Sequence, residues 1–138
     1  MSFETTVDIS VCPICNKEPG SHSLSDLGIV GGSRVFYTCP ANATKYNDLN
    51  GILNHYTNAL STIGEDTKWV WLFDSKGFNM THVMEFQVGI SLAKLITEKF
   101  SNNLEYIYIS NPTWYIHVMH RIITPFLSKN VREKIVII

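Results

Sequence analysis

Two cysteines near the N-terminus, Cys12 and Cys15, stand in a Cys-Pro-Ile-Cys sequence. Two thiolates at this spacing can bind one metal ion, and the motif resembles half of a zinc knuckle. A closed structural zinc site needs four ligands. The chain has three cysteines, so we expect the set Cys12, Cys15, His22 and Cys39. The alternatives are reduced thiols that bind nothing, or a Cys12–Cys15 redox pair.

Sequence signatures of the common enzyme classes are absent. The chain contains no Gly-x-Ser-x-Gly elbow, no phosphate-binding P-loop and no Gly-x-Gly-x-x-Gly motif. Asp74 ends a predicted strand, where α/β enzymes place carboxylates, but a structural role in a turn is the favoured interpretation. His55 and His82 have no obvious partners. We therefore expect no enzymatic activity.

The composition is that of a single globular domain. The 138 residues are 45% hydrophobic and 17% charged, with a formal net charge of -1, so a core can form. The charge balance argues against nucleic-acid binding. An apolar run long enough for a membrane span is absent, as is a signal peptide. We expect a cytoplasmic protein with at most peripheral membrane contact.

Strands and helices alternate along most of the sequence. Residues 1–32 look irregular, with Gly31-Gly32 in a loop. Strands are predicted at 33–39, 68–73, 104–110 and 134–138. Helices are predicted at 48–63, capped by Asp48, at 82–100, capped by Thr81, and at 113–127. The order predicts an α/β fold with a mostly parallel sheet covered by helices, and the strand at 68–73 is apolar enough to be covered on both faces.

Four short segments, in order, resemble the CRAL-TRIO family of lipid-binding domains. They are Asp74-Ser-Lys-Gly-Phe78, the strand 104–110 running into Asn111-Pro112, the helix from Trp114 that closes with Pro125-Phe126-Leu127, and Lys134-Ile135. The resemblance covers residues 33–138. It is nearest to a divergent branch that includes BCH-type domains, which bind proteins such as small GTPases and their regulators. It also implies a minimal form, reduced to the central part of the family domain.

The resemblance implies a function for the helix at 113–127. In the family, this helix is the movable wall of an apolar pocket that binds a lipid or another hydrophobic small molecule. The residues expected to contact such a ligand are Trp114, Tyr115, Met119, His120, Ile123 and Lys134. Among the family's phosphoinositide headgroup residues, Lys134 is kept, while Asn102 replaces the glutamate and Ile90 or Ser91 the arginine, so that headgroup is not expected. The alternatives are plain core packing for this helix, or a protein-interaction scaffold of the BCH type that forms a homodimer or binds another protein.

Overall fold

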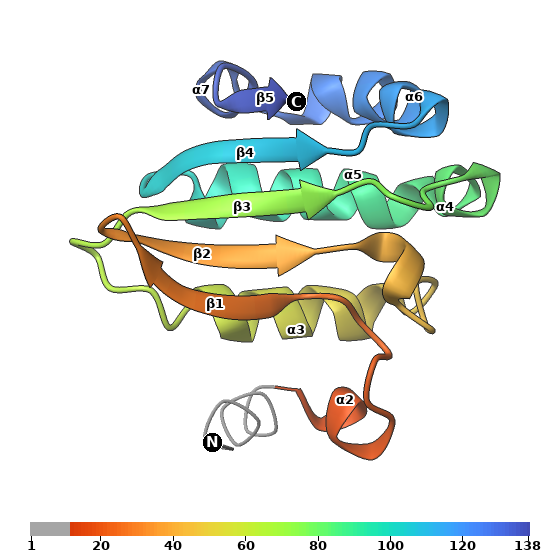
Figure 1. Ribbon diagram of the computed structural model, residues 1–138, viewed down its shortest axis with the longest axis horizontal. Coiled ribbons are helices and arrows are strands. Elements are labelled where there is room, and N and C mark those ends of the chain that lie inside the picture. Colours follow the sequence, from red (N-terminus) through yellow and green to blue (C-terminus); the bar gives the residue numbers. More distant parts are fainter. Residues whose placement is uncertain (1–11) are drawn as a thin grey trace.

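The structure is a computed structural model in which residues 12–138 are described. A five-stranded sheet has the order β1-β2-β3-β4-β5 (Figure 1). Strand β1 pairs with β2 antiparallel, and the other neighbours are parallel. The predicted α/β class with a mostly parallel sheet is confirmed. The strands are β1 (Ser25–Val30), β2 (Ser33–Thr38), β3 (Trp69–Asp74), β4 (Leu104–Ser110) and β5 (Ile135–Ile137).

The helices follow the predicted alternation with several changes in their bounds. The α-helices are α2 (Pro13–Lys17), α3 (Leu49–Leu60), α4 (Met80–Met84), α5 (Phe86–Leu95), α6 (Trp114–Ile123) and α7 (Lys129–Arg132). Short 3-10 turns occupy η1 (Pro40–Asn42) and η3 (Thr124–Phe126), and α5 continues into the π-helix η2 (Ile96–Phe100). Asp48 caps α3 as predicted, because its carboxylate accepts a hydrogen bond from Gly51 N.

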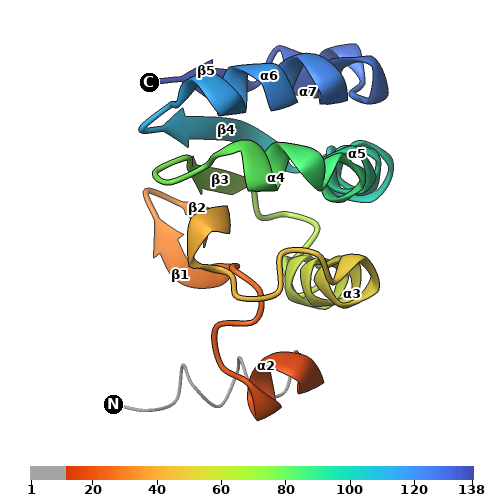
Figure 2. The ribbon, with the colours of Figure 1, turned by 90° about the vertical axis from the view of Figure 1, so that its right-hand side faces the viewer.

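The core lies between the sheet and one layer of helices. Phe36, Trp71 and Ile107 are register partners on β2, β3 and β4, and all three are buried in the core cluster. Figures 1 and 2 show α3 and α5 against this face of the sheet. No helix among residues 12–138 covers the second face of β3 (Figure 2), although Val70 on that face is only 8% exposed. Tyr106, on that face, is 42% exposed.

Residues 1–32 were predicted to be irregular, but part of this segment forms regular secondary structure. Strand β1 escapes detection because a bulge near Gly28 interrupts its alternation of apolar and polar residues. Gly31 and Gly32 form the tight turn of the β1–β2 hairpin, with φ values of 60° and 87°. Positive φ at both central residues is the signature of a two-residue hairpin turn. Residues 1–11 of the same segment lie outside the described residues.

The helix predicted at 82–100 begins earlier and is broken. Asn79, and not Thr81, is the N-cap of α4, and the His82 ring accepts a hydrogen bond from Asn79 N in a capping box. The chain leaves helical geometry at Glu85, with φ -89° and ψ 47°, before α5 begins. The buried residues of α5 are Val88, Leu92 and Ala93.

Candidate functional site

Helix α6 is held at its N-terminus by the two turns that the sequence singled out. Asn111, with φ of 48°, turns the chain after β4 and donates a hydrogen bond from Nδ2 to Asp74 Oδ1 at 3.0 Å. This bond, and a second from the Tyr37 hydroxyl, lower the pKa of Asp74. Thr113 caps α6 and donates to the carbonyl of Phe78 at 2.9 Å. Asp74 therefore acts as a structural anchor between the β3 and β4 turns.

An apolar cavity of about 80 Å³ lies between α6, α5 and the sheet. Its wall is almost entirely apolar. Three of the predicted ligand residues, Met119, His120 and Ile123, line it. The residues that sequence reasoning did not assign to it include Tyr46, Trp71, Gly89, Leu92, Ala93 and Ile107.

Gly89 allows the two cavity helices to approach each other. A Cβ atom at this position would lie 2.7 Å from the Sδ atom of Met119 and 3.3 Å from Ile123. The first separation is shorter than real Cβ contacts and the second is tight, so a side chain at position 89 would require Met119 to shift, and α6 packs against the bare backbone of α5. No apolar pattern could have revealed this residue, because its contribution is the missing side chain.

His120 is a polar group on the otherwise apolar wall. Burial lowers its pKa, and the nearby His117 lowers it further. Both effects disfavour the charged imidazolium, so His120 presents a neutral ring to the cavity. A neutral imidazole can donate or accept one hydrogen bond from a ligand without demanding a counter-charge.

The other three predicted ligand residues lie outside the cavity wall. Trp114 is 69% exposed and contacts Tyr115 edge to face at 5.2 Å. Tyr115 is partly buried and packs against the core cluster. Lys134 directs Nζ toward the carbonyl oxygen of Ser101 at 3.5 Å. Three of the six residues expected to contact a ligand thus line the cavity, and three do not.

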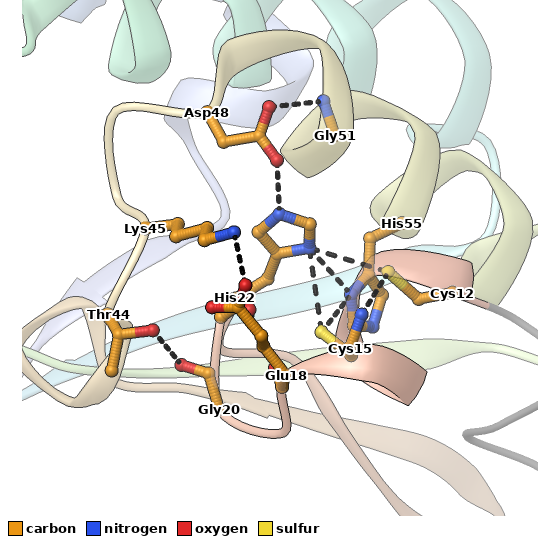
Figure 3. Close-up of polar contacts among 11 residues, drawn as sticks. Cys12, Cys15, Glu18, Gly20, His22, Thr44, Lys45, Asp48, Gly51 and His55 are labelled. Atoms are coloured by element: carbon orange, nitrogen blue, oxygen red, sulfur yellow. Dashed lines mark hydrogen bonds and ion pairs between the residues drawn. The ribbon is translucent and has the colours of Figure 1, made fainter.

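A second constellation lies at the N-terminal end, where Cys12, Cys15, His22 and His55 converge (Figure 3). Their potential ligand atoms lie within 4.8 Å of one another, a spacing that can hold a metal ion. Cys12, His22 and His55 are buried, and Cys15 is partly exposed. The three cysteines of the chain are free thiols.

Local structure explains how three of these residues come together. Cys12 caps the single turn of α2, and its Sγ accepts a hydrogen bond from Cys15 N at 3.5 Å. His55 lies seven residues after the cap residue Asp48, two helical turns away on the same side of α3. The His22 Nε2 atom lies 2.9 Å from Asp48 Oδ2. Asp48 therefore caps α3 and orients His22 at once.

Two members of the constellation have shifted pKa values. Burial, and secondarily His22, lower the pKa of His55 to about 4. The ring is thus neutral at physiological pH, which is the state that ligates metals. Burial is also the main reason why the pKa of Cys15 is raised. Burial therefore favours the protonated thiol of Cys15 over the thiolate.

Cys39, expected to be the fourth ligand, lies outside this constellation, and His55 takes its place. The Cys39 Sγ atom lies 3.6 Å from the carbonyl oxygen of Lys76, at the carboxyl end of β2. Helix α3 brings His55 next to His22 although 33 residues separate them. Sequence spacing alone gave no reason to join them, and the two-turn spacing from Asp48 was the one available signal.

Comparisons with known proteins agree on the fold. The family described as CRAL/TRIO domain matches residues 46–138, which run from before α3 to the end of β5. The crystal structure of Sfh5 matches with a TM-score of 0.69 at 11% sequence identity, over 99% of this chain. This chain spans 56% of the Sfh5 chain, and at this identity the likeness shows the fold alone. No curated protein matches the sequence.

The family match coincides with the landmarks that the structure connects. Asp74, Asn111 and the cavity wall of α6 all fall within the matched range. Among residues 12–138, none of the helices combines the length and the apolar character that a membrane span requires. Because the match extends over residues 46–138 of a 138-residue sequence, the chain belongs to the CRAL/TRIO domain family.

Proposed function

We propose that this chain binds a small hydrophobic molecule, of the lipid class, between the sheet and α6, without catalysing a reaction. The observation that carries the proposal is the apolar cavity beneath α6, and the membership of residues 46–138 in the CRAL/TRIO domain family supports it. Burying an apolar chain in such a site gains ~0.8 kcal/mol per methylene group. The neutral ring of His120 supplies one polar contact to orient a hydroxyl or ester group.

The size of the cavity sets a condition on this binding. Drug-sized ligands occupy pockets of roughly 300–1,000 Å³, whereas the cavity holds about 80 Å³. A lipid chain can enter only if α6 moves away from α5. The side-chain contact of Met119 and Ile123 with the bare backbone at Gly89 is apolar and can separate without breaking a hydrogen bond. The polar anchors at Asn111 and Thr113 stay at one end of α6 and favour rotation about that end.

A binding experiment with a matched pair of variants tests the proposal. Ile123 lines the cavity, whereas its neighbour Ile122 does not, and both are partly buried. Native mass spectrometry and lipid extraction of freshly purified protein identify any bound molecule. Titration with a fluorescent fatty acid then compares Ile123→Phe with Ile122→Phe. We expect the first variant to weaken binding at least tenfold and the second to leave it within about twofold.

Two results would contradict the proposal. One is wild-type protein that carries no lipid and shows no saturable binding of the fatty acid. The other is an equal loss of binding in both variants, which would place the fatty acid outside the cavity.

The protein-interaction scaffold is the alternative function, and the second face of the sheet, which no helix of the described residues covers, favours it. Tyr106 and Val136 on this face are 42% and 37% exposed. Tyr106 and Tyr108 lie side by side there, with ring centroids 5.4 Å apart. A native mass spectrum showing a ligand-free dimer that Tyr106→Glu converts to a monomer would support this alternative.

A further inference from the structure

Four of the six separations among the cysteine and histidine ligand atoms match those of a tetrahedral metal site, and all six are within 4.8 Å. An ion about 2.3 Å from each sulfur and about 2.05 Å from each nitrogen sets ideal separations of about 3.3 Å between nitrogens and about 3.6 Å between nitrogen and sulfur. The Nδ1 atoms of His22 and His55 lie 3.3 Å apart. The sulfur–nitrogen separations are 3.5 Å from Cys12 to His22 and 3.6 Å from Cys15 to each histidine.

Hydrogen bonding alone does not account for this arrangement. His22 directs Nε2 at the Asp48 carboxylate, which makes Nε2 the donor and leaves Nδ1 with one lone pair. Three neighbours, two sulfurs and the Nδ1 of His55, crowd this lone pair within 3.6 Å (Figure 3). One lone pair cannot satisfy three neighbours, whereas a single cation at their centre contacts every group at once.

The small helix α2 needs an anchor that its own sequence does not supply. It has five residues, none of them buried, and a helix of this length is not stable alone in water. Cys12 and Cys15 face His22 and, on α3, His55, and the side chain of Ile14 lies against Gly51 of the same helix.

We propose that Cys12, Cys15, His22 and His55 bind one zinc ion in a closed, structural site. Two thiolates and two imidazoles in tetrahedral arrangement are a donor set that zinc prefers. The two thiols release their protons on binding, and the four protein ligands leave no position for a substrate. The ion fixes α2 and the segment before β1 to the first turns of α3. This inference is independent of the proposed ligand beneath α6.

Metal analysis of the full chain tests the site. The protein is purified without added chelator. Its zinc content is then measured by elemental mass spectrometry of the acid-digested protein. We expect one zinc per chain in the wild type and a loss of at least tenfold in occupancy in Cys12→Ser and His55→Gln. Cys39→Ser is the matched control, because this buried thiol lies outside the site, and it should keep its zinc. Wild-type protein that contains no zinc and takes up none after reduction would overturn the proposal, and so would equal loss in Cys39→Ser.

A measurement on the wild type covers the case in which variants fail to fold. X-ray absorption of the zinc-loaded protein is expected to give two sulfur ligands near 2.3 Å and two nitrogen ligands near 2.0 Å. A shell of oxygen ligands, or of sulfur alone, would overturn the assignment. Asp48→Asn sharpens the test, because asparagine also caps helices but does not retain the carboxylate that faces His22. Its zinc affinity should fall 10–100-fold.

Discussion

The metal constellation and the apolar cavity differ in how much they say about their ligands. In the constellation of Cys12, Cys15, His22 and His55, the polar groups are directional, and their ligand atoms lie close enough together to hold one metal ion. In the cavity beneath α6, apolar walls have no direction, so about 80 Å³ of space specifies a class of molecule only. Directional contacts thus allow the identity of a ligand to be inferred from geometry. Where the contacts are not directional, only the volume of the site is informative.

Removing the metal should produce the largest change in stability. A ligand present at about 1,000 times its dissociation constant contributes ~4 kcal/mol to the free energy of unfolding. We therefore expect a chelator to lower the free energy of unfolding of the wild type by roughly that amount, measured by urea denaturation. The chelator should leave the fatty-acid affinity of the cavity within about twofold, since the two sites share no residue.

The control for metal removal is the His55→Gln variant, whose unfolding should no longer respond to the chelator. An identical unfolding curve of the wild type with and without chelator would contradict the expectation. A large loss of fatty-acid affinity would show instead that the two regions are coupled.

Enlarging the cavity should produce the next largest effect. Met119 is 4% exposed and lines the cavity, and deleting a buried side chain of this size costs 2–5 kcal/mol. We expect Met119→Ala to lower the free energy of unfolding by ~3 kcal/mol while it increases the affinity for a small apolar probe. Benzene titration followed by NMR chemical shifts measures the second effect.

Met119→Leu is the matched control, because it keeps most of the volume and should cost less than about 1.5 kcal/mol. Destabilisation by Met119→Ala without any gain in benzene affinity would mean that α6 collapses into the new space. That result would argue against an expandable site.

The sequence predicted the strands well wherever turn-forming residues stand at both ends of a strand. Strand β4 has the predicted bounds 104–110, since Asn102-Asn103 precedes it and Asn111-Pro112 follows. Strand β1 was missed because its bulge at Gly28 breaks the alternation. The break at Glu85 was missed because the apolar pattern of 82–100 continues through it.

A residue of a candidate site could be predicted only where the residues near it in the sequence form a recognisable motif. The family resemblance implied Met119 and Ile123 as cavity residues, and the Cys-Pro-Ile-Cys sequence pointed to two of the four residues of the proposed metal site. Gly89 gave no signal, because it acts through an absent side chain. His55 gave little, because helix α3 joins it to residues that are 33 and 40 positions away. Long-range pairing of this kind is decided by packing and not by spacing.

Acidification should destabilise the cavity region by a smaller amount. The pKa of His120 is lowered in the folded protein, so the unfolded chain binds more protons as the pH falls. Stability is therefore complete above the ordinary histidine pKa of about 6.5 and decreases as the pH falls below it. We expect the loss between pH 7.5 and 5.5 to be smaller in His120→Gln than in the wild type, by less than about 1 kcal/mol because water screens part of the ring.

Urea denaturation at both pH values checks this difference. Zinc loss at low pH affects the wild type and the variant alike, so it cancels in the comparison. An equal loss in both proteins would show that His120 is solvated in the folded state. In that case the polar contact that we assign to it within the cavity would not form.

Trp114→Ala should have the smallest effect, although the sequence placed Trp114 first among the ligand residues. The side chain is 69% exposed and its aromatic contact is with Tyr115, outside the cavity wall. Exposed substitutions of this kind usually change the free energy of unfolding by less than about 0.5 kcal/mol. Urea denaturation and fatty-acid titration should therefore both match the wild type. A loss of fatty-acid affinity at unchanged stability would extend the ligand site to the first turn of α6, and the site would then be larger than the 80 Å³ cavity that the closed structure shows.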